Sequence, residues 1–255
     1  MNAKYQQVIA NIFRSCVNDT ITRVLRNPPT YRPFHSALLS DEVIFWSSFE
    51  RGFSTSFGHK VIEQVAYLVA LANGADEAQR QKESWLQLDV AYDYAISQHI
   101  QALRAQNADT PHDLDTAIAA IRSIKLNGQT KDIRVISDLW WKKDGIDHFI
   151  SLKTAKPNID QTAVAKEDCL RLSLALPNCR VYFGLPYNPY GESKDSYAFH
   201  PPMRIFDFHH DPVVLIGKEL WDTIGGYGCY DELIAIAKDV GQDTKHIIQA
   251  KLAQR

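Results

Sequence analysis

Cysteine is scarce in this 255-residue sequence, and long apolar runs are absent from it. The four cysteines form neither a CxxC pair nor a zinc-ligand spacing, so we expect reduced thiols and no structural metal site. No stretch approaches the ~18 uncharged apolar residues that a transmembrane helix requires, and the start of the chain lacks the apolar segment of a signal peptide. We therefore expect a soluble cytoplasmic protein that does not bind membranes.

An excess of charge of one sign is also lacking, because 28 Lys and Arg residues nearly balance 30 Asp and Glu residues. The net charge of −2 gives no global attraction to a polyanion, so a nucleic-acid site would have to be a local basic surface. Hydrophobic residues make up 45% of the chain, which excludes a disordered protein. Because no linker or repeat interrupts the sequence, we expect a single domain over residues 1–255.

Helical spacing of apolar residues dominates the first half of the chain. It predicts a helix at 9–25 that ends at Asn27-Pro28-Pro29, because proline cannot continue a helix. A proline-containing loop is expected at 31–40. Further helices are predicted at 57–72, 85–103 and 110–124. Residues 1–126 are therefore expected to be mostly helical.

Strand-forming sequence begins after Asn127-Gly128. Strands are predicted at 134–141 and 147–154, and the turn at 142–145 joins them into a hairpin. The remaining elements are a helix capped by Asn158 and two strands, expected at 159–176, 180–185 and 212–217. This order predicts an α/β fold with a mixed β-sheet flanked by helices and a largely helical N-terminal half.

The hairpin brings an acid and an amine onto neighbouring strands. Asp138 lies on the first strand and Lys153 on the second, where the period of two places Ser151 on the same face as Lys153. A carboxylate beside a lysine suits metal-assisted phosphodiester hydrolysis, since the acid holds Mg²⁺ while the ammonium orients water and offsets charge on the phosphate. A simple cross-strand ion pair would give the same local pattern.

The segment from Asp138 to Lys153 resembles the PD-(D/E)XK nuclease signature, with Ser137 in place of the proline and Ser151 in place of the second acid. It is also similar to the CCGG-cutting branch of restriction endonucleases, which has Ser-x-Lys and takes the missing carboxylate from the following helix. Glu167 stands fourteen positions after Lys153, as that branch requires. The resemblance therefore implies that a helix carboxylate has replaced the strand acid.

This helix carboxylate has competing interpretations. Glu167 has mostly apolar neighbours at helical spacing, where an unpaired charge is costly, and a bound metal would explain it. Asp168 is the rival ligand, and Asp147 is a further acid on the hairpin. Arg171 would make Glu167 an ordinary ion-pair partner.

Longer strings extend the resemblance. Residues 50–58, 151–162, 185–191 and 217–226 look like a type II restriction endonuclease of the TdeIII-like group, over about residues 50–240. The resemblance implies a restriction-endonuclease-like core, with the catalytic α/β portion at about 127–255. It also implies Mg²⁺-dependent double-strand cleavage of a short palindromic site of GGNCC type, and a cognate DNA methyltransferase that shares the site without direct contact.

The resemblance further assigns roles to individual residues. Mg²⁺ would be held by Asp138, Glu167 and the backbone carbonyl of Leu152, and Lys153 would position or deprotonate the attacking water. Glu63 would come from the 57–72 helix as a second-metal ligand, although a solvated or ion-paired helix residue would look the same. The predicted catalytic set is Asp138, Ser151, Lys153, Glu167 and Glu63.

A palindromic target implies double-stranded DNA bound by a homodimer or a higher even oligomer, in which each subunit cuts one strand. The sequence pattern does not identify a recognition helix. The polar segment 187–204 is the best candidate for base contacts, although a solvated loop fits equally well, and residues next to Lys153 are expected to touch phosphate. The predicted DNA-binding residues are Lys156, Gln161, Asn188, Lys194, His200 and Arg204.

Two other functions also fit the sequence. A DNA-binding protein could have kept the nuclease fold after losing activity, as the serine at position 151 suggests. A structure-specific repair nuclease would keep the chemistry but act on branched or damaged DNA. The first would bind duplex DNA without cutting it, and the second would leave an intact plasmid uncut.

Overall fold

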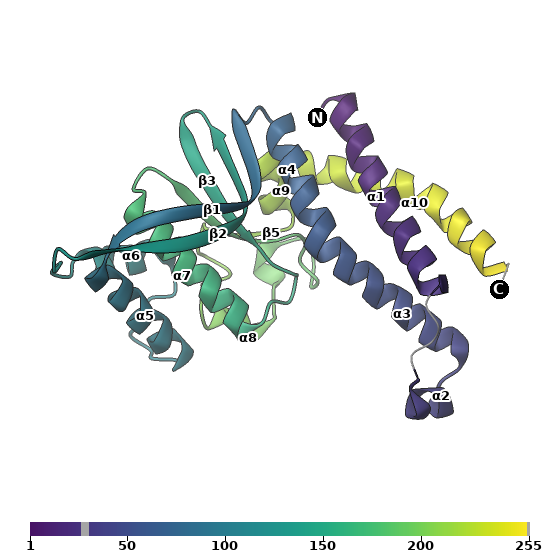
Figure 1. Cartoon of the computed structure of the whole chain (residues 1–255), viewed down its shortest axis with the longest axis horizontal. Helices are drawn as coiled ribbons and strands as arrows, with labels where there is room; N and C mark the ends of the chain where they lie inside the picture. The colour runs from purple at the N-terminus through teal and green to yellow at the C-terminus, as the bar shows by residue number, and fades with distance from the viewer. Residues whose placement is uncertain (27–30, 254–255) are drawn as a thin grey trace.

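The computed structural model describes residues 1–26 and 31–253, and in it an α/β part is joined to a projecting helical arm (Figure 1). The α/β part is built on a five-stranded sheet with the order β1-β2-β3-β4-β5. β2 pairs antiparallel with both of its neighbours, β1 and β3, and β3, β4 and β5 run parallel. The strands are β1 (Glu77–Asp89), β2 (Thr130–Lys143), β3 (Ile146–Leu152), β4 (Arg180–Leu185) and β5 (Val214–Ile216). The predicted α/β class and mixed sheet are confirmed.

Helices cover both faces of the sheet, and each face has its own hydrophobic core. One core lies against α5 (Val90–Arg104), α6 (Leu114–Arg122) and α7 (Ile159–Ala175), and includes Phe149 and Phe183. The other core lies against α1 (Ala3–Arg26), α4 (Ile62–Ala72), α9 (Lys218–Gly225) and α10 (Cys229–Ala253), and includes Leu139 and Ile150. Short helical segments η2 (Lys194–Ser196) and α8 (His200–Met203) lie between β4 and β5.

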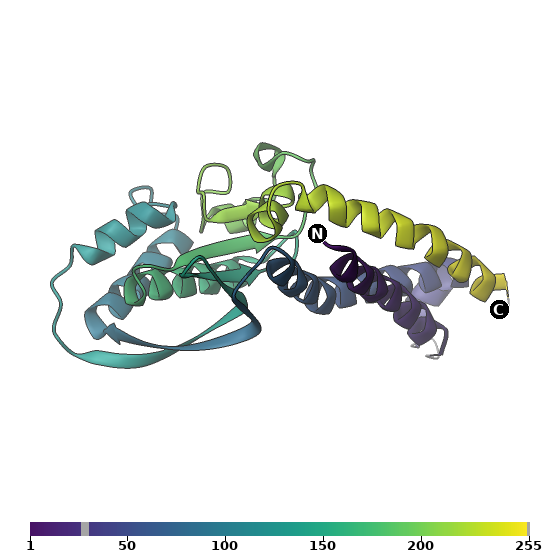
Figure 2. The ribbon, with the colours of Figure 1, turned by 90° about the horizontal axis from the view of Figure 1, so that it is seen from above.

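The arm is built around one long helical run whose last segment packs against the sheet. It consists of α3 (Asp41–Ser56), the π-helical segment η1 (Phe57–Val61) and α4, which packs against β1 and β2. A short helix, α2 (Pro33–Leu38), lies at the end of the arm, and Figures 1 and 2 show α1 and α10 extending along it. None of the described helices combines the length and apolarity needed to cross a bilayer.

Local signals in the second half act as predicted. Asp144 and Gly145 form the two-residue hairpin turn with φ values of 52° and 75°, the positive values that a tight turn of this kind requires. The Asn158 side chain caps α7 by accepting a hydrogen bond from the backbone N–H of Gln161. All four cysteines are free thiols, as predicted.

Three predictions for the first half are wrong. Residues 85–89, predicted as the start of a helix, instead belong to β1, because Leu86 and Leu88 are buried at a period of two and the strand pairs with the distant β2. Position 90 begins the helix predicted from residue 85, after Asp89 caps it. The expected loop at 31–40 contains α2, and the helix predicted from residue 57 already begins at Asp41, where Ser40 supplies a cap. The predicted helix stop at Asn27-Pro28-Pro29 lies outside the described residues.

Candidate active site

The hairpin places Asp138 against the end of β3. Its Oδ2 atom accepts hydrogen bonds from the Leu152 backbone N–H at 2.7 Å, the Lys153 ammonium at 3.0 Å and the Ser151 hydroxyl at 3.3 Å. The side chains of Asp138 and Lys153 are only 18% and 22% exposed, so their ion pair is partly shielded from water. The acid, serine and lysine predicted from the sequence therefore lie together.

A second carboxylate reaches this group from the helical run. Glu63 lies in the first turn of α4 and accepts a hydrogen bond from the Gln81 amide at 3.0 Å, and the same amide nitrogen donates to Oδ1 of Asp138 at 3.1 Å. The adjacent η1 segment also approaches the end of β3, since a Cβ on Gly58 would lie 3.7 Å from the Thr154 side chain. Glu63 is thus linked to Asp138 through Gln81, a residue that the sequence patterns did not indicate.

The α7 carboxylates are engaged by Arg171. Its guanidinium lies 2.7 Å from Glu167 and 3.6 Å from Asp168, and it also contacts the buried carboxylate of Asp93 on α5 at 2.9 Å. Although burial opposes it, hydrogen bonds from Lys131 and Arg171 hold the pKa of Asp93 below its usual value. The ion pair between Glu167 and Arg171, considered as an alternative at the sequence level, is present.

Asp168 is the α7 acid whose ionisation is affected by the charge of Lys153. Burial raises the pKa of Asp168 to about 6, and the charge of Glu167 adds to that rise, whereas Arg171 and Lys153 oppose it. In the described chain Lys153 forms an ion pair with Asp138 and with neither α7 acid. The third alternative, Asp147, accepts a hydrogen bond from the Trp140 indole N–H at 3.0 Å.

The donor set at the end of β3 suits a hard cation. The Lys153 ammonium lies 3.0 Å from Asp138 Oδ2 and 3.2 Å from the carbonyl oxygen of Leu152, so two of the predicted Mg²⁺ ligands already share one positive charge. Carboxylate and carbonyl oxygens are the ligands that Mg²⁺ prefers. Among residues 1–26 and 31–253, however, no three acidic, histidine or cysteine side chains converge as a ready metal site. A full coordination shell would need water, substrate oxygens or movement of an α7 acid.

The predicted DNA-binding residues fall into two groups. Four of them have exposed side chains: Lys156, Gln161, His200 and Arg204. Asn188 instead donates to the Ser193 carbonyl and the Ser196 hydroxyl. Lys194 is likewise bonded within the protein, so both Asn188 and Lys194 would have to give up these hydrogen bonds to contact DNA.

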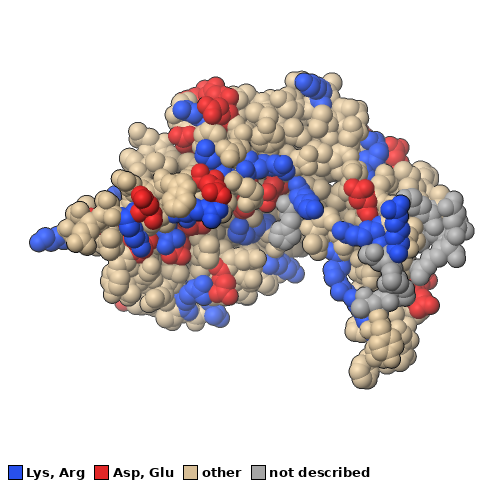
Figure 3. Space-filling view, in the orientation of Figure 1, with Lys and Arg blue, Asp and Glu red and all other residues tan. Residues whose placement is uncertain are grey.

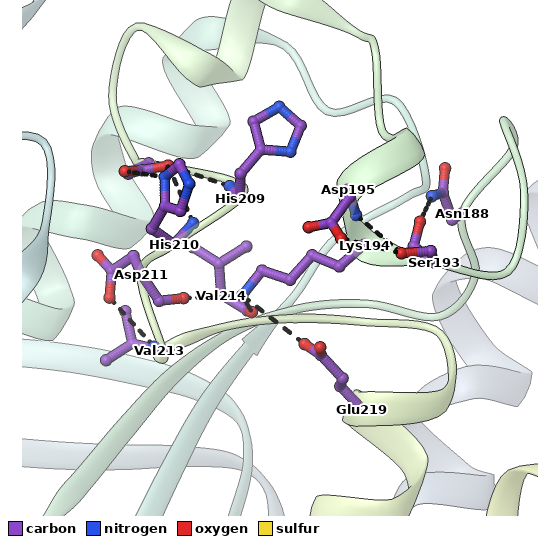
Figure 4. A network of polar contacts seen from close by, with 11 residues as sticks. Asn188, Ser193, Lys194, Asp195, His209, His210, Asp211, Val213, Val214 and Glu219 are labelled. Atoms are coloured by element: carbon purple, nitrogen blue, oxygen red, sulfur yellow. Dashed lines mark hydrogen bonds and ion pairs between the residues drawn. The ribbon is translucent and has the colours of Figure 1, made fainter.

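Figure 4 shows how Lys194 is held. Its side chain is only 10% exposed, and its ammonium donates to the backbone carbonyls of Asp211 at 2.9 Å and Val214 at 2.7 Å, with Glu219 at 3.7 Å. These contacts tie the η2 loop to the start of β5. The geometry therefore favours a structural role for Lys194.

A hollow separates the α/β part from the helical arm on the face shown in Figure 3. Lys and Arg side chains lie on both sides of it, although acidic side chains are also present on this face. The nearly neutral chain therefore has a local concentration of positive charge beside a concave surface.

A model of the family described as type II restriction endonuclease, HinfI, matches residues 1–241. The chain belongs to this family. The type II restriction enzymes HgiEI and HgiBI of Herpetosiphon aurantiacus are each 32% identical to it over 230 residues, which cover 88% of this chain and 82% of theirs. HgiCII of the same organism is 27% identical over 239 residues, which cover 92% of this chain and 86% of that enzyme.

Membership of the HinfI family makes the chain a type II site-specific deoxyribonuclease, which confirms the predicted enzyme class. It also favours restriction over the DNA-repair alternative. The predicted TdeIII-like subgroup is a finer assignment than this match and stays a prediction.

Proposed function

We propose that the protein makes Mg²⁺-dependent double-strand cuts at a short palindromic DNA site of GGNCC type. The observation that carries the proposal is the arrangement at the end of β3, where one ammonium, from Lys153, contacts both the Asp138 carboxylate and the Leu152 carbonyl. An acid, a backbone oxygen and an amine at one point form a suitable set for phosphodiester hydrolysis.

In this proposal Asp138 and the Leu152 carbonyl hold Mg²⁺, with a carboxylate of α7, Glu167 or Asp168, as a further ligand. When bound, Mg²⁺ would polarise a water molecule and neutralise charge on the phosphate. As an ammonium, Lys153 would donate hydrogen bonds to the attacking water and offset the developing negative charge. To deprotonate that water instead, Lys153 would first have to release its own proton, and it would become the ammonium on accepting the proton of the water. Attack in line with the leaving oxygen would give a 5′-phosphate and a 3′-hydroxyl.

Ser151 and Glu63 have supporting places in the same scheme. The Ser151 hydroxyl donates to Asp138 at 3.3 Å from the strand position where a PD-(D/E)XK enzyme has its second acid. Glu63 is the candidate for a second metal. These positions support a PD-(D/E)XK-type active site with a relocated acid, and a TdeIII-like assignment is compatible with them.

The hollow beside the arm is the proposed DNA-binding surface, because clustered Lys and Arg attract the phosphate backbone. Lys156, Gln161, His200 and Arg204 are proposed as further DNA contacts because their side chains are exposed. A palindromic site would be cut by a homodimer or higher even oligomer with one active site per strand. A cognate methyltransferase would protect the same sequence in the host DNA.

The function is tested by removing the lysine. We expect Lys153→Ala to lower the cleavage rate at least ~100-fold while duplex binding in Ca²⁺ is preserved, because it removes a charge acting in the transition state. Lys238→Ala, an exposed lysine on α10, is the matched control and should cut normally. Full activity in Lys153→Ala would refute the proposed site. Duplex binding without cleavage by the unmodified protein would favour the inactive DNA-binding alternative.

A further inference from the structure

We infer that Gln81 is a positioning residue that holds Glu63 beside Asp138 and so shapes the proposed metal-binding site of this nuclease. The inference rests on the proposed function, because it concerns the carboxylates assigned to Mg²⁺. Gln81 belongs to β1, which the sequence patterns did not identify as a strand.

The amide of Gln81 bridges the two acids. Its nitrogen lies 3.0 Å from Glu63 Oε2 and 3.1 Å from Asp138 Oδ1, and a primary amide carries two N–H donors, one for each carboxylate. Two carboxylates held this close repel each other, and a donor between them offsets the repulsion. Replacing that donor removes both hydrogen bonds by which Gln81 joins Glu63 to Asp138.

The backbone of Gln81 is adapted to this role. Arg80 pairs with Leu139 and Lys82 with Ser137, so Gln81 stands opposite Asp138 in the register. Its φ is 49°, in the left-handed region that non-glycine residues rarely adopt. Such backbone outliers persist where the surrounding structure holds them and cluster at functional sites.

The β1–β2 ribbon changes faces at this point. On β2, Ile133 and Val135 belong to the core beneath α5, α6 and α7, whereas Leu139 and Trp141 belong to the opposite core. The change therefore falls between Val135 and Leu139, next to Asp138. The unusual backbone of Gln81 accompanies this crossing, which places its amide over the acid.

The test measures metal binding directly, by following free Mn²⁺ with electron paramagnetic resonance in the absence of DNA. Mn²⁺ accepts the same oxygen ligands as Mg²⁺. Gln81→Met keeps the side-chain length and loses the amide, whereas Gln81→Gly also relieves the positive φ. We expect both to weaken Mn²⁺ binding ~10-fold, the usual effect of losing a residue that orients a metal ligand. Gln87→Met, at an exposed glutamine of the same strand, should leave it unchanged.

A double-mutant cycle separates positioning from a general structural effect. If Gln81 acts through Glu63, then adding Gln81→Met to Glu63→Gln should weaken Mn²⁺ binding no further. Additive losses, or unchanged binding in both Gln81 variants, would overturn the inference. Asp138→Asn tests the metal site itself. If this variant binds Mn²⁺ as well as the parent does, the proposed metal site is wrong. If Asp138→Asn abolishes Mn²⁺ binding while both Gln81 variants bind normally, the metal site stands and only the role of Gln81 is wrong.

Discussion

Asp168, one of the two α7 acids near the proposed site, has a carboxyl group whose ionisation is altered by burial. Burial raises its pKa to about 6, so the folded state favours its protonated form. This group therefore stabilises the fold fully below pH ~4, the pKa of an unfolded aspartate, and the stabilisation is lost as the pH rises through about 6. At neutral pH the ionised carboxylate of Asp168 therefore lowers the free energy of unfolding.

Replacing Asp168 with asparagine tests whether the ionised carboxylate destabilises the fold. We expect Asp168→Asn to raise the free energy of unfolding by about 2 kcal/mol at pH 8 in EDTA, and to change it little at pH 4, because asparagine resembles the protonated acid. Urea denaturation at the two pH values measures both. A variant that is less stable than the parent at pH 8 would show that the ion pair with Arg171 outweighs the cost of burial.

Between elements, α5 and α7 are joined by two ion pairs that differ in burial. The Asp93 and Arg171 side chains are 10% and 19% exposed, whereas those of Arg104 and Asp160 are 40% and 72% exposed. A buried charge left without its partner is costly, and an exposed pair contributes little because water and salt screen it.

We therefore expect Arg171→Met to destabilise the fold by about 3 kcal/mol, since it leaves Asp93 without its guanidinium. Arg104→Met should cost about 0.5 kcal/mol and serves as the control on the same pair of helices. Chemical denaturation at neutral pH compares them. Equal losses would mean that Asp93 is satisfied by Lys131 alone.

Elements with local signals could be predicted from the sequence, and elements that depend on distant partners could not. The hairpin turn at Asp144, the Asn158 cap and β4 follow from residues within a few positions of each element, so the pairing of Asp138 with Lys153 was accessible. β1 was misassigned because its apolar residues also fit a helix, and only pairing with β2, more than forty residues away, selects the strand. Gln81 was missed for the same reason.

Contacts to α7 were predicted in part. The spacing from Lys153 indicated Glu167, and the i, i+4 spacing indicated its ion pair with Arg171. Nothing in the sequence places Asp93 of α5 on the same guanidinium, because helix packing brings that contact together. The choice between Glu167 and Asp168 likewise depends on how α7 lies against the sheet.

For the whole molecule, the arm and the α/β part are connected through the α3–η1–α4 run. Glu63 lies near the start of α4, just beyond a π-helical segment, a feature often found at functional sites. The run therefore connects the side of the hollow seen in Figure 3 with the carboxylates at the end of β3. We propose that residues 1–255 act as one nuclease domain, in which bound DNA would be aligned with the active site by this run.

The most direct test of sequence-specific cleavage is to sequence the ends of plasmid fragments made by the purified protein in Mg²⁺. We expect discrete fragments whose ends all map to one short palindromic sequence and carry 5′-phosphates, with no fragments in EDTA or from Lys153→Ala. A GGNCC-type sequence would also support the predicted subgroup. Fragment ends without a common sequence, or discrete cutting by Lys153→Ala, would contradict the proposed function.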